Sequence, residues 1–214
     1  MKKKANNPQE LTKPRKRPDT KKMVGLALLI ALVVVLQFVS AAIPPIGGFT
    51  ISLVLIPVVM GAAVYGPLAG ALLGGVFGVV VAINCINGTD IGGQMVLQAN
   101  PVLCIFVVLI KGILAGFVAG WVYRLLKNKN AHLAMLCSAI LCPVINTGVF
   151  VTFMLTCFRS VLEKWASGGE IMAYVFSFII LANFVPELLI NIAFGTAGQG
   201  VVDAVKKNTK NARR

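Results

Sequence analysis

Long apolar stretches separated by short polar connections dominate the pattern of this chain. Six of them lie between residues 23 and 205: Met23–Ile43, Ser52–Tyr65, Pro67–Asn84, Pro101–Leu126, Leu133–Phe158 and Ile171–Val205. A helix needs about 20 apolar residues to cross the hydrocarbon core of a bilayer, and a helix satisfies its own backbone hydrogen bonds in lipid. The pattern therefore predicts an all-α integral membrane protein with six transmembrane helices. The second stretch is the shortest of the six.

The composition agrees with a membrane protein and argues against other classes. Of the 214 residues, 57% are hydrophobic and 13% are charged, and the mean hydropathy is +0.86. Soluble domains are about 45–50% apolar and about 25% charged. A soluble fold of this size has no core large enough to bury so much apolar surface. A soluble enzyme, a disordered protein and a secreted disulfide scaffold are therefore disfavoured.

The formal net charge of +13 is concentrated outside the apolar stretches. Nine of the 20 Lys and Arg residues precede residue 23, five follow residue 205, and three lie in or beside the loop 127–132. Basic loops stay on the cytoplasmic side of a membrane, so we expect both termini inside. Such charges suit anionic lipid headgroups better than nucleic acid. The predicted domains are a disordered cytoplasmic tail (1–22), a six-helix membrane domain (23–205) and a second cytoplasmic tail (206–214).

A few polar side chains interrupt the apolar stretches, and these are the candidates for a binding site. Polar groups at membrane depth are costly, so they face the bundle interior or a cavity. Lys111, Asn146 and Glu187 fall at comparable depth on three different predicted helices. An ammonium suits a carboxylate ligand, and amides suit hydroxyls and carbonyls. The candidate substrate-binding residues are Lys111, Asn146, Asn183, Glu187, Gln37 and Asn84.

Other interpretations of the same polar residues remain open from the sequence. A Lys111–Glu187 ion pair would lock two helices together, and the asparagines would then satisfy backbone groups near prolines. Glu187 would alternatively serve a proton relay. No phosphate-binding, acyl-transfer or metal-hydrolysis motif occurs in the sequence. The five cysteines lack zinc spacing and are interpreted as small apolar fillers. We therefore expect no enzymatic activity, no metal and no cofactor bound by this chain.

Small residues recur at every fourth position in several predicted helices. Glycines follow this spacing from Gly66 to Gly78 and again from Gly112 to Gly120. Residues so spaced share one helix face and let two backbones approach closely, so internal helix packing is the expected role. A shorter stripe, Ala27 and Ala31, lies near the inner end of the first helix. There it can dock another protein.

Part of this pattern matches a known family. Ile56-Pro57, Gly61, the turn Tyr65–Gly70 and the glycine-rich helix after it resemble the substrate-binding S component of energy-coupling factor (ECF) vitamin transporters. Ala27 and Ala31 match the stripe of small residues that such proteins present to their partner. The resemblance covers residues 23 to about 205. The stretch from Gly47 to Asn84, together with Lys111, looks most similar to the pantothenate-type branch.

The resemblance implies a six-helix bundle in the bacterial cell membrane that captures a vitamin, pantothenate first, from outside. It implies a transmembrane coupling protein and two cytoplasmic ATPases as partners, and ATP would be used by those subunits. Lys111 would then hold the carboxylate and Glu187 would orient Lys111. The remaining candidate residues would contact amide and hydroxyl groups. The alternatives are a riboflavin or folate transporter of the same type, a stand-alone ion-coupled carrier, and a structural or assembly protein of the membrane.

Overall fold

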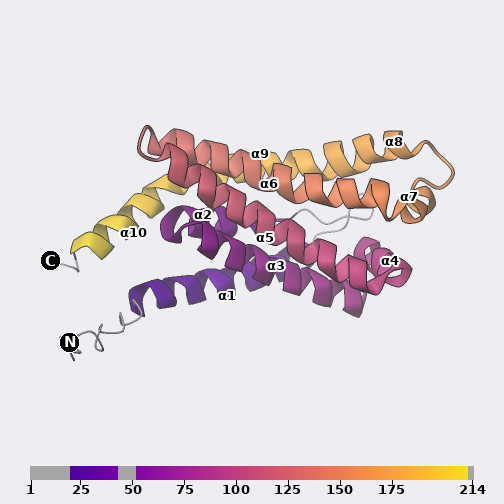
Figure 1. Ribbon diagram of the computed structural model, residues 1–214, viewed down its shortest axis with the longest axis horizontal. Coiled ribbons are helices and arrows are strands. Elements are labelled where there is room, and N and C mark those ends of the chain that lie inside the picture. Colours follow the sequence, from indigo (N-terminus) through magenta and orange to yellow (C-terminus); the bar gives the residue numbers. More distant parts are fainter. Residues whose placement is uncertain (1–19, 43–51, 212–214) are drawn as a thin grey trace, which may run out of the picture.

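The computed structural model describes residues 20–42 and 52–211, and these residues form helices and short connections with no strand. The helices in chain order are α1 (Thr20–Ala42), α2 (Leu55–Tyr65), α3 (Pro67–Asn87), α4 (Ile91–Ala99), α5 (Pro101–Leu126), α6 (Ala131–Thr156), α7 (Arg159–Trp165), α8 (Ile171–Tyr174), the π-helix η2 (Val175–Phe184), α9 (Val185–Ala197) and α10 (Gln199–Asn211). Figure 1 shows an elongated bundle of long helices. The start of α1 and the end of α10 lie at one end, and α4, α7 and α8 lie at the other.

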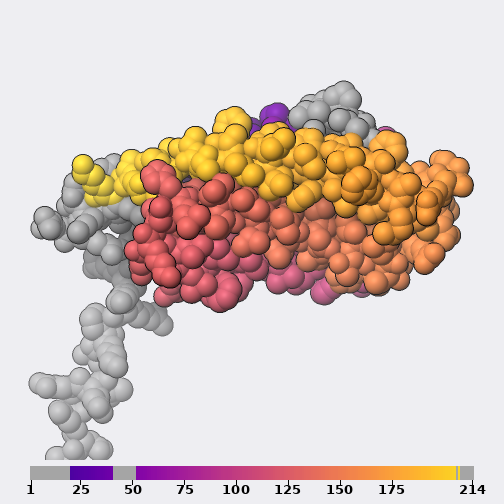
Figure 2. Space-filling model, turned by 90° about the horizontal axis from the view of Figure 1, so that it is seen from above, coloured from indigo at the N-terminus to yellow at the C-terminus, as the bar shows by residue number. Residues whose placement is uncertain are grey.

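Among the residues that the structure describes, five helical segments are long and apolar enough to cross a membrane. They are α1, α3, α5, α6 and the continuous segment Ile171–Ala197, which joins α8, η2 and α9 and is called the last span below. Figure 2 shows the last span running along one face of the molecule, with α10 beyond it. The predicted helix Pro101–Leu126 coincides with α5. The chain is thus a multi-pass membrane protein.

The second predicted crossing is shorter in the structure than a membrane span. The α2 helix has 11 residues, which at about 1.5 Å per residue gives about 16 Å. The sixth predicted stretch also ends earlier than Val205. The α9 helix ends at Ala197, and a separate helix, α10, begins after Gly198. A sixth full crossing therefore remains a prediction, as does the orientation of the bundle.

A single residue, Gly66, turns the chain between α2 and α3. Its φ of 97° lies in the region that favours glycine. The Gly66 N–H donates to the Ala62 carbonyl at 2.9 Å, and the Gly66 carbonyl accepts from the Gly70 N–H at 3.1 Å. Pro67 then opens α3 at the position where the missing N–H costs nothing. This turn packs α2 against α3.

The α3 and α5 helices pack backbone against backbone through their glycines. Gly74 lies opposite Gly112, and a Cβ on either residue would collide with the carbonyl of the other. One turn away, Gly70 and Gly116 face each other in the same way. At the next turn a Cβ on Gly78 would lie 2.6 Å from a carbonyl oxygen of α5. The glycine spacing therefore serves internal packing, as predicted, and the two glycine ridges are each other's partners.

The last span contains a ten-residue π-helix, Val175–Phe184, directly before Pro186. Proline has no N–H to donate, and its ring crowds the carbonyl four residues earlier. A π-helical segment relieves such a conflict by widening the turn. Asn183 lies within this π-helix and Glu187 lies three residues after its end, so the widened turns alter the direction in which both side chains point. Both of these polar residues face the interior of the bundle.

We predict that Gly74→Ala destabilises the protein by about 1–3 kcal/mol, the usual cost of overpacking a tight interior. The new methyl group would meet the Gly112 backbone. Gly148→Ala on α6 is the matched control, because a Cβ there meets nothing within 4 Å. Alanine is favoured over glycine in helices, so this control should unfold at the same or a slightly higher temperature. Thermal unfolding in one detergent gives the midpoint temperature of each variant. Equal midpoints for Gly74→Ala and Gly148→Ala would contradict the close α3–α5 contact.

Candidate functional site

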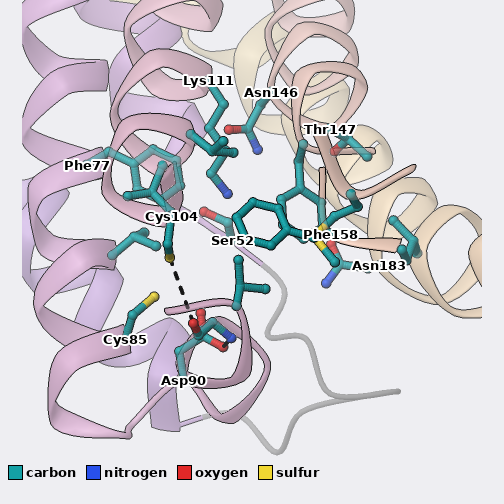
Figure 3. Close-up of a pocket in the computed structure, with 18 of the residues that line it drawn as sticks. Ser52, Phe77, Cys85, Asp90, Cys104, Lys111, Asn146, Thr147, Phe158 and Asn183 are labelled. Carbon is teal, nitrogen blue, oxygen red and sulfur yellow. Dashed lines mark hydrogen bonds between the residues drawn. The ribbon is translucent and has the colours of Figure 1, made fainter. Parts of the chain in front are cut away.

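A cavity of about 100 Å³ lies among α1, α3, α4, α5, α6 and the last span. It is shown in Figure 3. A water-sized group needs roughly 10–15 Å³ of such volume, so the cavity accommodates a small molecule. Five of the six predicted substrate-binding residues line it: Gln37, Lys111, Asn146, Asn183 and Glu187. Residues from α1, α5, α6 and the last span thus meet at one place.

Asn84 is the predicted binding residue that the structure does not bring into the cavity lining. It is buried on α3 with 5% of its surface exposed, while its neighbour Cys85 lines the cavity. Successive residues of a helix point about 100° apart, and on α3 the direction of Cys85, not that of Asn84, meets the cavity. The Asn84 backbone carbonyl accepts a hydrogen bond from the Asp90 N–H at 3.3 Å. Asn84 was predicted as an amide that would contact amide and hydroxyl groups of the ligand, whereas the rotation of α3 decides which side chains reach the cavity.

The Lys111 side chain lies between two aromatic rings at the cavity wall. Its Nζ is 5.7 Å from the centroid of the Phe77 ring and 5.1 Å from that of Phe150. Aromatic faces attract an ammonium through their quadrupole, so the two rings position the charge without neutralising it. Phe77 and Lys111 each directly precede a glycine of the α3–α5 contact. The close helix packing therefore sets where the ammonium sits.

Lys111 and Glu187 do not form the ion pair that one interpretation of the sequence requires. Within the described residues the salt bridge at 4.0 Å or less is the exposed pair Arg159–Glu163 on α7, at 3.5 Å. Lys111 and Glu187 nevertheless line the same cavity, and Glu187 is only 2% exposed. A direct charge pair that locks two helices does not account for them. Any orienting effect of Glu187 on Lys111 acts across the cavity.

Four buried oxygen atoms in the cavity wall have no hydrogen-bond partner within the described part of the chain. They are Gln37 Oε1, Ser52 Oγ, Asn146 Oδ1 and Glu187 Oε1. Buried polar groups are nearly always hydrogen-bonded, and one left without a partner costs about 1–3 kcal/mol. Each of these atoms can accept a hydrogen bond. The cavity therefore complements a ligand with one anionic group and several O–H or N–H donors.

Sequence reasoning missed the part of the site that α4 contributes. Asp90 caps α4 by accepting a hydrogen bond from the Gly93 N–H at 2.9 Å, and both residues line the cavity. The Trp165 Nε1–H on α7 donates to Met95 Sδ at 3.1 Å and ties α4 to α7. An Asp before an apolar run is a readable helix start. The polar, glycine-containing stretch 85–100 is typical of a loop that covers a cavity mouth, but the sequence does not show which of its residues line the cavity.

The stripe of small residues predicted for partner docking lies on the surface. Ala27 and Ala31 are both exposed on α1. Large apolar side chains next to them are exposed as well, including Val24 (54%) and Leu28 (67%). This face of α1 is thus open to lipid or to another protein, and it lies away from the cavity lining.

Comparison with known proteins agrees with the resemblance seen in the sequence. Residues 21–196 match the family described as ECF transporter, substrate-specific component. The chain is also 27% identical over 198 residues to the pantothenic acid transporter PanT of Lactococcus lactis subsp. cremoris (strain MG1363). That match covers 87% of this chain and 94% of the relative. Both results concern transport proteins. Because the family match extends from α1 to α9, across every cavity-lining helix, this chain belongs to the substrate-specific component family of ECF transporters.

Proposed function

We propose that this chain captures pantothenate as the substrate-binding subunit of an ATP-driven vitamin uptake transporter in the bacterial cell membrane. Its family supports the role of substrate capture, and the relative named for pantothenic acid supports the ligand. The observation that carries the ligand proposal is the composition of the cavity wall. It combines one ammonium with four buried oxygen acceptors that lack partners among the described residues.

Pantothenate matches this wall group by group. Its single carboxylate would accept from the Lys111 ammonium, a charge-assisted bond of about 1.5–3 kcal/mol. Its amide N–H and two hydroxyls would donate to unpartnered oxygens such as Asn146 Oδ1, Gln37 Oε1 and Ser52 Oγ. Asn183 lines the same cavity and would contact the polar chain of the ligand. Riboflavin has no carboxylate and folate has two, so a single lysine favours the monoanion.

The proposed topology has both termini inside and the cavity toward the outside. Exposed basic residues gather where α1 begins and where α5 meets α6, for example Lys22, Arg124 and Lys127. Figure 1 places both of these regions at the end of the bundle opposite α4 and α7. The positive-inside rule therefore puts α4 and the cavity on the outer side. In this topology the short helix α2 is a membrane segment in addition to the five longer spans.

Energy for uptake would come from other subunits. In this proposal a transmembrane coupling protein and two cytoplasmic ATPases use the ATP, and this chain binds no cofactor. The exposed pair Ala27 and Ala31 would present a smooth surface to the coupling protein, because small residues allow close helix approach. Family membership favours this arrangement over a stand-alone ion-coupled carrier.

We predict that Lys111→Ala weakens pantothenate binding by at least about 1.5 kcal/mol, which is roughly tenfold in Kd. Isothermal titration of the purified protein measures the change. Arg124→Ala is the matched control, because it removes an exposed cation from the same helix outside the cavity. Its affinity should equal that of the parent protein. Absence of measurable binding to the parent would overturn the pantothenate assignment.

We predict that the effect of Lys111→Ala depends on the ligand carboxylate. Panthenol carries a hydroxymethyl group in place of that carboxylate and keeps the amide and hydroxyls. It should bind the parent protein more weakly than pantothenate does, and Lys111→Ala should change its affinity much less. The four titrations form a thermodynamic cycle that isolates the lysine–carboxylate interaction. Equal losses for both ligands would show that Lys111 does not hold the carboxylate.

We predict that transport needs the partner subunits. Liposomes containing this chain alone should bind labelled pantothenate without accumulating it, even under proton or sodium gradients. Liposomes that also contain the coupling protein and both ATPases should accumulate it when ATP is supplied on the ATPase side. Gradient-driven accumulation by the single chain would support the ion-coupled carrier instead.

A further inference from the structure

Two free cysteines lie side by side in the wall of the cavity. Cys85 on α3 and Cys104 on α5 are 0% and 2% exposed, and both line the cavity. Their side chains approach the same residue of α4, Gly93. Figure 3 shows them on the same side of the cavity, close to Asp90 and away from the labelled residues of α6 and the last span. The binding role proposed above uses neither thiol.

Both sulfur atoms also contact α4 at one residue, Gly93. The Cys104 Sγ lies 3.9 Å from the Gly93 carbonyl oxygen, to which its thiol donates. A Cβ added to Gly93 would collide with the Cys85 Sγ. The α4 helix connects α3 to α5, so the chain between the two cysteines contains the whole of α4. A bond between the sulfurs would close that segment into a loop against the cavity.

The interpretation of the cysteines as apolar fillers fits Cys142 but not this pair. Cys142 is also fully buried, on α6, yet it does not line the cavity. Cys85 and Cys104, in contrast, come from two helices and line the same side of the cavity. Two buried thiols that share one neighbour in one cavity wall are candidates for a disulfide, provided that their Cα atoms come within about 7 Å of each other.

We propose that Cys85 and Cys104 form an oxidation-sensitive dithiol whose disulfide slows ligand exchange. Each thiol gives up its hydrogen, one S–S bond forms, and a small two-electron oxidant takes up both hydrogens. The inference rests on the proposed topology, because thiols on the outer side of a membrane meet oxidising conditions. The disulfide joins the end of α3 to the start of α5 and restrains α4 at the cavity. Passage of pantothenate past α4 is then slower in both directions.

The disulfide is tested first, without any ligand. The parent protein for this test carries Cys137→Ser and Cys157→Ser, which remove the half-buried and the exposed thiol outside the site. It is treated with diamide, an oxidant whose N=N bond accepts two hydrogens. Mass tagging after denaturation should show two thiols lost and Cys142 retained. Peptide mapping without reductant should join the peptides of Cys85 and Cys104. Adding Cys104→Ser should abolish this link, and absence of the link in the parent overturns the proposal.

The effect on exchange is then measured with labelled pantothenate. Association and dissociation should both be slower in the oxidised protein and should return to the starting rates after a thiol reductant. The Cys104→Ser protein should show no change between its own reduced and oxidised samples. Unchanged rates in a fully linked protein would overturn the gating role. Failure of the reduced protein to bind pantothenate would instead overturn the proposed function, while the peptide map would still decide whether the dithiol is oxidised.

Discussion

The close contact between the backbones of α3 and α5 is the constraint on which the site depends. Lipid offers no hydrophobic drive for two apolar helices to associate, so small residues and close packing must supply it. Gly74 and Gly112 provide this contact at its centre. Phe77 and Lys111 lie beside the same contact, which brings the ammonium over the Phe77 ring at 5.7 Å. A wider helix spacing would separate the cation from the ring and alter one wall of the cavity.

The polar groups of the cavity are arranged to meet a ligand rather than one another. The ammonium of Lys111 rests between two rings, and no carboxylate lies within salt-bridge distance of it in the described structure. Four oxygens around the same cavity lack partners there. In an apolar bundle such groups are costly to leave unsatisfied. The proposed ligand offsets that cost by bringing one negative charge and several hydrogen-bond donors. Selectivity for such a ligand would then follow from the polar groups that line the cavity.

The α4 corner combines mechanical and chemical features that would act together in capture. Asp90 caps the helix, Trp165 holds it from α7, and Gly93 rests on the sulfurs of Cys85 and Cys104. Apolar packing adds to these contacts, because Val96 of α4 is 4% exposed and belongs to the hydrophobic core. The proposed disulfide would act at this corner because α3, α4 and α5 all meet there.

The apolar spans and the glycine ridges could be predicted from the sequence, and five of the six predicted binding residues line the cavity. Span length and the period of a helix are local properties, so they can be read from hydropathy and spacing. Lys111, Asn146 and Glu187, which were chosen by their depth in the predicted helices, line the cavity, and their role in binding stays a prediction. The packing of the helices, in contrast, sets which helix faces turn inward, keeps Lys111 and Glu187 beyond salt-bridge distance, and brings Cys85 and Cys104 to one cavity. The rotation of a helix and its choice of neighbours arise from packing between distant segments, which no local pattern records.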